Sequence, residues 1–166
     1  MADKDFTLSK EYLNLIFEYK KGKLFRKINV SNAKTGDEAG YLNKRLGYLY
    51  VYINNKNYRV HRIIFMMHHG YVPNLIDHID GDKLNNKIEN LRQATKSENY
   101  YNSKIRKDNS SGVNGVCFDK VRKKWCACAV INGKKKYIGR FADIESAKNA
   151  IVDFKKLHHK DFFRNS

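Results

Sequence analysis

Short alternations of apolar and polar residues dominate the first sixty positions of the chain and predict β-strands. Residues 48–53 mix β-branched with aromatic side chains, and the polar run 54–57 separates them from a second strand pattern at 58–60. Upstream, residues 17–19 and 24–26 flank the polar run Lys20-Lys-Gly-Lys23. Each pattern predicts a β-hairpin, so we expect a β-rich N-terminal part.

After residue 60 the apolar spacing changes and predicts helices. Residues 61–69 form a short helical pattern that ends at Gly70, and residues 91–94 predict a short strand. Thr95 and Glu98 have the spacing of a capping box, so a helix is expected from Lys96 to about Lys107.

A polar stretch ending in glycine, residues 107–112, is typical of a linker. Three strands are predicted beyond it, at 116–119, 125–131 and 135–141, with Asn132-Gly133 as a two-residue hairpin turn. Asp143 then caps a helix with an apolar face; that face contains Ala147, Ala150, Ile151, Phe154 and Leu157. We therefore expect an α+β fold with two domains, residues 1–109 and 110–166.

The composition of the 166 residues, 42% hydrophobic and 13% aromatic, is that of a folded protein. There is no apolar run of about 18 residues and no secretory signal pattern, so a cytoplasmic protein without a membrane partner is expected. Three cysteines with no CxxC pair argue against a disulfide framework and against a cysteine-based zinc site.

The excess of 33 Lys and Arg over 17 Asp and Glu gives a net charge of +16 and indicates a polyanionic partner, nucleic acid in the first place. Residues 1–60 hold 12 basic and 6 acidic residues, 61–109 hold 8 and 6, and 110–166 hold 13 and 5. The middle segment is therefore the least positive, as expected of a cation site between two phosphate-binding surfaces.

The candidate chemistry lies in this middle segment, at Asp77, His78, Asn90 and Asn99. A histidine can take a proton from water near pH 7, and carboxylate and amide oxygens are donors that Mg²⁺ accepts. Asn99 would lie near the start of the predicted helix, where the helix dipole favours an anionic phosphate. These residue types suit phosphodiester hydrolysis.

The same segment resembles the HNH nucleases of phages and mobile introns. The resemblance rests on Val60-His-Arg-Ile-Ile-Phe65, Asp77-His-Ile-Asp-Gly-Asp-Lys-Leu-Asn-Asn86, Glu89-Asn-Leu-Arg92 and Ser97-Glu-Asn99, and it spans roughly residues 40–103. It implies a ββα-metal finger, in which two short strands and a helix surround one divalent ion.

Residue by residue, the resemblance implies that His78 is the general base and that Asp77 binds the metal. Asn90, which we group with His78 as catalytic, corresponds to the middle position that holds the loop through hydrogen bonds. Asn99 corresponds to the last motif position, where many members have histidine and homing-type members have asparagine. Asparagine there favours one oxygen-ligated divalent cation, Mg²⁺ or Mn²⁺, over zinc or nickel.

Several neighbouring residues allow two interpretations. Asp80 and Asp82 could form a calcium loop, although Asp-Gly-Asp is more often a turn. Asn102 and Ser103, one helical turn beyond Asn99, could touch phosphate or metal. The remaining histidines of the predicted helix, residues 61, 68 and 69, are expected to be packing or surface residues.

Residues 113–166 show a second resemblance, to the Apetala-two or ethylene-response-factor type of DNA-binding domain. It rests on Val113-Asn-Gly-Val116, Lys124-Trp125, Tyr137-Ile-Gly-Arg-Phe141 and Ile144-Glu-Ser-Ala147. It implies a three-stranded sheet on one helix, with the sheet in the DNA major groove. The DNA-binding residues expected from it are Arg122, Lys123, Lys124, Lys135, Tyr137 and Arg140.

Alternation within the second strand of this unit assigns its residues to two faces. Trp125, Ala127, Ala129 and Ile131 should face the helix, whereas Cys126, Cys128 and Val130 should face outward, where plant relatives have base-reading residues. We therefore expect phosphate contacts with few base contacts.

The resulting hypothesis is a homing-type, metal-dependent endonuclease of double-stranded DNA. One active site per chain predicts nicking by a monomer, unless the protein acts as a homodimer. The alternatives are a non-catalytic DNA-binding regulator derived from such a nuclease and an RNA-binding protein. Whether residues 1–60 contact DNA stays open.

Overall fold

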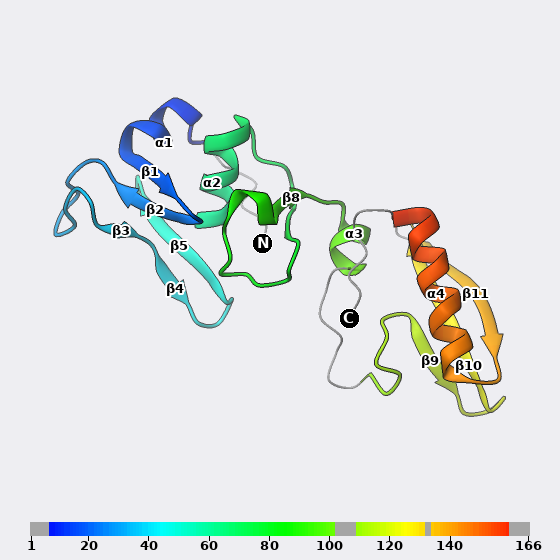
Figure 1. The fold of residues 1–166 in the computed structure, drawn as a ribbon. Helices are drawn as coiled ribbons and strands as arrows, with labels where there is room; N and C mark the ends of the chain where they lie inside the picture. The colour runs from blue at the N-terminus through cyan, green and yellow to red at the C-terminus, as the bar shows by residue number, and fades with distance from the viewer. Residues whose placement is uncertain (1–6, 102–108, 132–133, 160–166) are drawn as a thin grey trace. The chain divides into compact units, whose positions relative to one another are not determined.

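The computed structural model describes residues 7–101, 109–131 and 134–159. The chain divides into two compact units, Met1–Gln93 and Ala94–Ser166. Both are built from small antiparallel sheets with helices, which is a mixed α/β architecture (Figure 1). The boundary predicted from the sequence, at 109/110, assigns α3 (Lys96–Tyr101) to the first unit. In the structure α3 belongs to the second unit, which begins at Ala94.

The first unit begins with a short helix, α1 (Lys10–Ile16), in the region predicted to be mainly β. Ser9 caps it, because the Ser9 hydroxyl accepts a hydrogen bond from the Tyr12 N–H at 3.2 Å. Leu13 and Ile16, spaced for one helical face, are buried in the core. The prediction missed this helix because only two turns of pattern precede the first strand.

A three-stranded sheet follows α1, in the order β1-β2-β3. Its strands are β1 (Phe17–Lys20), β2 (Lys23–Arg26) and β3 (Glu38–Ala39). The predicted hairpin is confirmed, with Lys21 and Gly22 at positive φ in a two-residue turn.

The second sheet has the order β4-β5-β6 and leads directly into a helix. Its strands are β4 (Tyr41–Asn43), β5 (Tyr48–Ile53) and β6 (Lys56–Arg59), and helix α2 (Val60–His69) follows. The turn between β5 and β6 is shorter than predicted, because Asn54 and Asn55 both take positive φ and close it alone. Gly70 ends α2 in the left-handed conformation, as predicted.

Helix α2 is the centre of the first unit. Ile63 and Ile64 are fully buried and pack among side chains from α1 and from strands of both sheets. Seven of the ten residues of α2 are buried, the polar His61 and Arg62 among them, so the helix is held on several sides and supports the neighbouring strands.

The last elements of the first unit carry the predicted site. Strand β7 (Ile76–His78) pairs antiparallel with β8 (Leu91–Gln93), and a single 3₁₀ turn (Ile88–Asn90) precedes β8. The register joins Asp77 to Arg92 and His78 to Leu91. Residues 79–87 form the loop between the two strands.

The second unit begins with α3, whose capping box is present as predicted. The Thr95 N–H donates to Glu98 Oε2 at 2.6 Å, and the Glu98 N–H donates to Thr95 Oγ1 at 3.3 Å. Asn102 and Ser103, and the predicted continuation of the helix towards Lys107, lie outside the described residues.

A three-stranded sheet with one covering helix forms the rest of the second unit (Figure 1). Its elements are β9 (Val116–Asp119), β10 (Lys124–Ile131), β11 (Lys134–Phe141) and α4 (Ile144–His159). Ala147 and Ile151 of α4 are fully buried against Ala127 and Ala129 of β10. The predicted strands and the cap at Asp143 are confirmed in this unit. Of the residues of β10 predicted to face the helix, Trp125, Ala127 and Ala129 pack in the core and Ile131 does not, while Cys126, predicted to face outward, is buried.

Two details of the second unit differ from the prediction. Leu157 was assigned to the apolar face of α4 but is 74% exposed, because the helix extends past the sheet that covers its other apolar residues. The polar stretch before β9 is a hydrogen-bonded turn from Asn109 onward. Asn109 Oδ1 accepts from the Ser111 N–H and the Gly112 N–H, and the Ser111 side chain is buried.

Helices in the described part of the chain are all too short or too polar to span a lipid bilayer.

Candidate functional site

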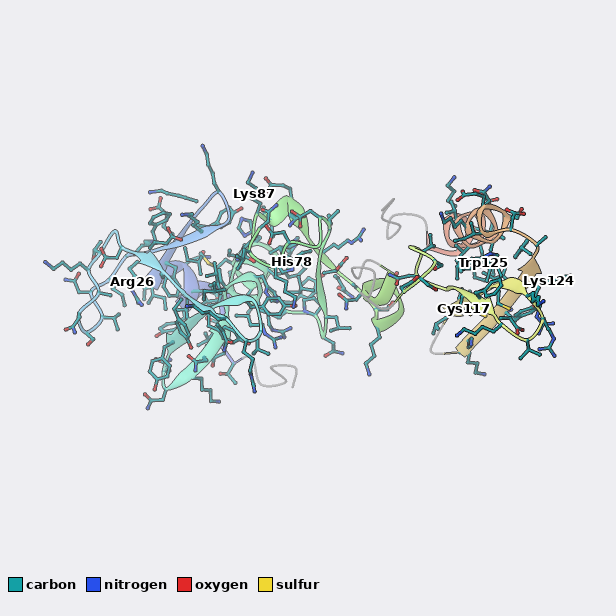
Figure 2. The ribbon with its side chains drawn as sticks, turned by 90° about the horizontal axis from the view of Figure 1, so that it is seen from below. Arg26, His78, Lys87, Cys117, Lys124 and Trp125 are labelled. Carbon is teal, nitrogen blue, oxygen red and sulfur yellow. The ribbon has the colours of Figure 1, made fainter. Side chains whose placement is uncertain are left out.

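Asp77 and His78 lie at the end of β7 and are both buried in the first unit, where His78 is surrounded by side chains (Figure 2). The β7–β8 register brings Arg92 to Asp77. Arg92 Nε donates to Asp77 Oδ2 at 3.0 Å, and Nη2 lies 2.9 Å from the same oxygen. Asp77 is therefore a buried carboxylate whose charge is matched by a guanidinium, an interaction that the sequence reasoning missed.

His78 is held by an amide from the far side of the loop. Its Nε2 lies 3.1 Å from Oδ1 of Asn86, whose side chain is only 2% exposed. An amide oxygen can only accept, so Nε2 carries the proton in this contact. In the neutral ring Nδ1 then has the lone pair, which makes Nδ1 the nitrogen that can receive a proton.

A second histidine, His61 of α2, packs against His78. The two ring centroids are 5.0 Å apart and the rings are nearly perpendicular. Burial lowers the pKa of His61 well below its ordinary value, and the neighbouring His78 and the cations Arg59 and Arg62 lower it further. The sequence predicted only a packing or surface residue at His61, because the proximity of His61 to His78 depends on how α2 packs in the core and has no signature in the spacing.

Asn90 ties the two ends of the 79–87 loop together. Its Nδ2 donates to Asp80 Oδ1 at 2.9 Å and to the Asn85 carbonyl at 2.8 Å, and its Oδ1 accepts from the Asp80 N–H at 3.1 Å. Asn90 thus satisfies both sides of its amide within the loop that carries Asn86. A part for Asn90 in the chemistry stays a prediction.

Asp80 and Asp82 act as turn residues in this loop. Asp80 Oδ1 accepts from the Asp82 N–H at 2.8 Å, and Asp82 Oδ1 accepts from the Leu84 N–H at 3.0 Å. Burial alone would raise the pKa of Asp80, but hydrogen bonds from Asn85, Asn90 and the Asp82 N–H, with the nearby His78, together lower it. These contacts are those of a turn, which is one of the two interpretations of the Asp-Gly-Asp sequence; the other is a calcium loop.

Asn99 lies on α3, is exposed, and donates its backbone N–H to the Thr95 carbonyl at 3.0 Å. It belongs to the second unit, whereas Asp77 belongs to the first, so a shared metal site stays a prediction. Within the described residues, no three or more His, Cys, Asp or Glu side chains are gathered to hold an ion. A hard cation could still use carboxylate and amide oxygens, the donor types of Asp77 and Asn99.

Three of the six predicted DNA-binding residues, Lys135, Tyr137 and Arg140, lie on the face of the second unit's sheet away from α4. The register pairs Cys126 with Arg140, Cys128 with Tyr137 and Val130 with Lys135, so these six side chains share one face. A bulge at the Ala127/Cys128 step keeps Arg140 on that face.

Several contacts organise the cations of this face. The Arg140 guanidinium lies 5.7 Å from the Tyr137 ring, and its Nε is 3.8 Å from Asp119 Oδ2. Arg122, Lys123 and Lys124 are exposed at the β9–β10 turn, where Arg122 also contacts Asp119 at 3.3 Å. All six predicted residues are thus exposed.

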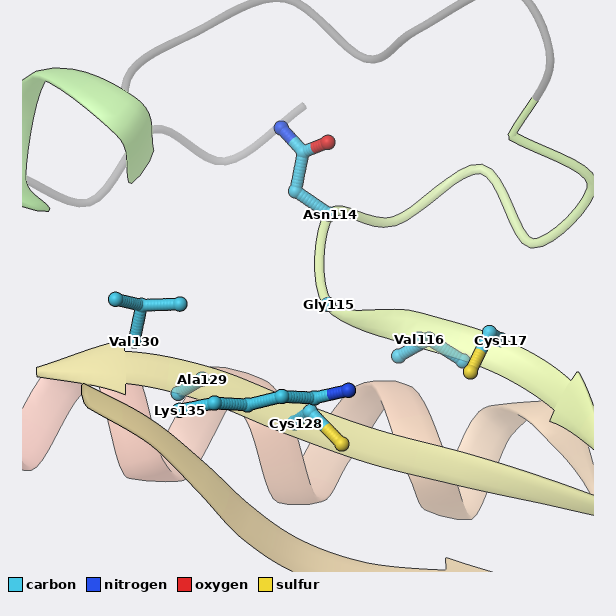
Figure 3. A pocket seen from close by; sticks show the side chains of 8 residues that line it. All are labelled: Asn114, Gly115, Val116, Cys117, Cys128, Ala129, Val130 and Lys135. Carbon is cyan, nitrogen blue, oxygen red and sulfur yellow. The ribbon is translucent and has the colours of Figure 1, made fainter. Parts of the chain in front are cut away.

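A hollow of about 350 Å³ lies over the same sheet. Its lining includes Cys117, Cys128 and Lys135, and Figure 3 shows the Lys135 amino group beside Cys128. Burial raises the pKa of the Cys128 thiol, with Lys135 acting in the opposite direction. The three cysteines are free thiols in the structure.

Comparison with known proteins finds one relative and one family that match part of this chain. Escherichia phage T7 has a protein, "Protein 3.8", that is 43% identical over 60 residues, which make up 36% of this chain and 50% of that protein. This chain therefore covers about half the length of that relative. No solved structure matches this chain. Residues 58–101 match the family described as HNH endonuclease, and Asp77, His78, Asn90 and Asn99 lie inside the matched segment.

Proposed function

We propose that this protein is a metal-dependent endonuclease that hydrolyses phosphodiester bonds of duplex DNA. The observation that carries the proposal is the buried His78, whose Nε2 lies 3.1 Å from the amide oxygen of Asn86, a contact that suits Nδ1 to the role of proton acceptor. A general base needs a fixed ring and a fixed tautomer, and this contact supplies both. The match to the HNH endonuclease family over residues 58–101 supports the same reading.

In this mechanism His78 takes a proton from the attacking water at Nδ1. Asn86 holds the imidazole, and Asn90 holds the loop that carries Asn86. Asp77 and Asn99 would hold one divalent cation, Mg²⁺ or Mn²⁺, in a finger of the ββα-metal type. When bound, such an ion stabilises the negative charge on the phosphate and on the leaving oxygen.

Asp77 suits this role in its donor chemistry. A carboxylate has two oxygens, and the contacts from Arg92 Nε and Nη2 both end on one of them, Oδ2. Arg92 therefore orients the carboxylate from one side.

We also propose that the second unit binds duplex DNA through the outer face of β9–β11, in the manner of an Apetala-two type domain. The support is the shared face of Lys135, Tyr137 and Arg140 together with the basic turn before β10. With one site per chain, the expected product is a nick. The phage relative supports a phage-encoded protein that acts in a host cell.

A second candidate is a non-catalytic DNA-binding regulator. The ion pair between Asp77 and Arg92 favours it, because the guanidinium already balances the carboxylate that the nuclease needs for its cation. This regulator would keep the basic surfaces and would not depend on metal.

Cleavage of a supercoiled plasmid tests the two candidates. Wild-type protein with Mg²⁺ or Mn²⁺ should convert the plasmid to open circles, and EDTA should stop the conversion. His78→Ala should lower the rate by about 100-fold or more, because the general base is lost. His78→Gln keeps a polar group beside Asn86 and should be equally inactive.

His158→Ala is the matched control, since His158 is exposed on α4 and should leave cleavage unchanged. Circular dichroism and DNA binding of each variant show whether it is folded. Binding without cleavage by the wild type, in any ion and on DNA that includes its target, would contradict the nuclease proposal and support the regulator.

A further inference from the structure

The ring of Tyr48 is half-buried near His78, and two cations contact it. Lys83 Nζ is 4.6 Å and Arg59 Cζ is 5.2 Å from the ring centroid. The same ring is 6.2 Å from the His78 ring and 5.3 Å from the His61 ring. One half-buried tyrosine therefore links a pair of buried histidines to a pair of cations.

Lys83 is positioned by a hairpin far from it in the sequence. Its Nζ donates to the Leu46 carbonyl at 3.2 Å, in the turn between β4 and β5. A Cβ on Gly47 of that turn would lie 3.7 Å from Lys83 Cδ, so the lysine stem runs along the turn. The residue is exposed, and an ammonium has two more protons to donate after the one to Leu46.

Arg59 reaches the ring from β6 and is held there as well. Its Nε donates to the Tyr50 hydroxyl at 3.0 Å, and its guanidinium also lies 5.9 Å from the Tyr50 ring. Tyr48 therefore gathers two cations at one ring, and a phosphate anion close to both would be attracted by each of them.

We propose that Lys83, with Arg59, forms a phosphate-binding site in the first unit for the DNA strand that lies at His78. Lys83 Nζ is 4.6 Å from the Tyr48 ring centroid, which is 6.2 Å from that of His78. The distance from the Lys83 ammonium to the His78 ring therefore cannot exceed the sum of these two distances. A DNA strand rises about 3.4 Å per nucleotide, so Lys83 can contact a phosphate within a few nucleotides of the one at His78. The inference rests on the proposed binding of duplex DNA, and it makes the N-terminal part of the chain a direct DNA contact.

The test is the salt dependence of duplex binding by the full-length protein in EDTA, where no cleavage is expected. Each phosphate contact contributes about 0.9 to the slope of log K against log salt. Lys83→Met should therefore lower the slope by about that amount, and Lys83→Arg should retain it.

Lys27→Met is the matched control. Lys27 Nζ also donates to one backbone carbonyl, that of Asn14 at 2.7 Å, so both substitutions remove one charge and one such bond. Its slope should equal that of the wild type. In addition, duplex DNA should protect Lys83, and not Lys27, from acetylation detected by mass spectrometry.

An unchanged slope for Lys83→Met, or equal losses for Lys83→Met and Lys27→Met, would overturn the inference and leave the nuclease proposal standing. A wild-type protein that binds DNA with the Lys83-dependent slope but never cleaves would overturn the nuclease proposal alone.

Discussion

At the scale of single residues, burial decides what the histidines of the first unit can do. His61 is 4% exposed and packs edge-on against His78, while His68 and His69 near the end of the same helix are exposed. A charge at His61 would have to lose its hydration beside another imidazole and near two cations. His61 is therefore neutral in the folded protein at neutral pH, and it supports the ring of His78 without competing for a proton.

This burial predicts a pH dependence of stability. Because the pKa of His61 is lowered on folding, the unfolded chain binds a proton that the folded chain does not, so stability falls as the pH drops below about 6.5. The His61 share of this loss is at most about 1.4 kcal/mol for each pH unit. His61→Phe should flatten the dependence in urea unfolding between pH 5 and 8.

His158→Phe serves as the comparison, because it replaces an exposed histidine by the same residue. If His61→Phe and wild type lost stability equally as the pH fell, His61 would not be the buried neutral group inferred from the structure.

At the scale of elements, short local signals are accurate where an element is bounded by a turn or a cap. The Lys21-Gly22 turn, the capping box of α3 and the Asp143 cap of α4 all occur where the sequence predicts them. The errors lie at α1, at the β5–β6 turn and at Leu157. Helix α1 is too short to give a clear periodic pattern, and the exposure of Leu157 depends on how far the sheet extends along α4, which is a matter of packing.

Gly115, just before β9, lies so close to β10 and α4 that it has no room for a side chain. Its φ is +96°, and an added Cβ would meet the Cys128 carbonyl oxygen and lie 2.7 Å from Ile151 Cδ1. Gly115→Ala should therefore destabilise the protein by about 3 kcal/mol, through the positive φ and the contact with the core of α4. Thermal unfolding followed by Trp125 fluorescence measures the change in this unit.

Gly112→Ala separates the two costs. Gly112 has φ +68° but no atom within 4 Å of an added Cβ, so only the backbone cost of about 1–2 kcal/mol should appear. Equal losses for the two variants would mean that the contact of Gly115 with the sheet and α4 adds nothing.

At the scale of the whole molecule, positive charge occurs on both units, with the candidate site in the first. The first unit offers Lys83 and Arg59 at Tyr48, and the second offers the outer face of β9–β11. Two separate basic surfaces can hold one duplex more tightly than either alone, because the second contact forms at a high local concentration. The net charge of +16 is in keeping with this use.

Two adjacent lysines of β11 test the assignment of the sheet face. Lys135 pairs with Val130 on the outer face, whereas Lys136 pairs with Ala129 on the face towards α4. If the outer face contacts phosphates, Lys135→Met should lower the salt slope of duplex binding by about 0.9, and Lys136→Met should lower it less. Electrophoretic mobility shifts over a range of salt concentrations provide the measurement. The same loss in both variants would show that charge, and not the face of the sheet, determines binding.

The sequence by itself determined the local elements and the residue types of the site. Turn residues, caps and alternation depend on neighbours a few positions apart, so the hairpins, α2 and the β9–β11–α4 unit could be predicted from them. The ordered pattern at Asp77, His78, Asn90 and Asn99 likewise identified the segment that matches the HNH endonuclease family.

Tertiary structure alone decided which side chains meet. Arg92 reaches Asp77 because β7 and β8 pair in one register, and Asn86 reaches His78 because Asn90 closes the loop between those strands. Lys83 contacts Leu46, 37 positions away, and His61 meets His78 only because α2 is packed in the core. Such contacts follow from register and packing, which bring together residues whose distance along the chain has no fixed relation to their distance in space.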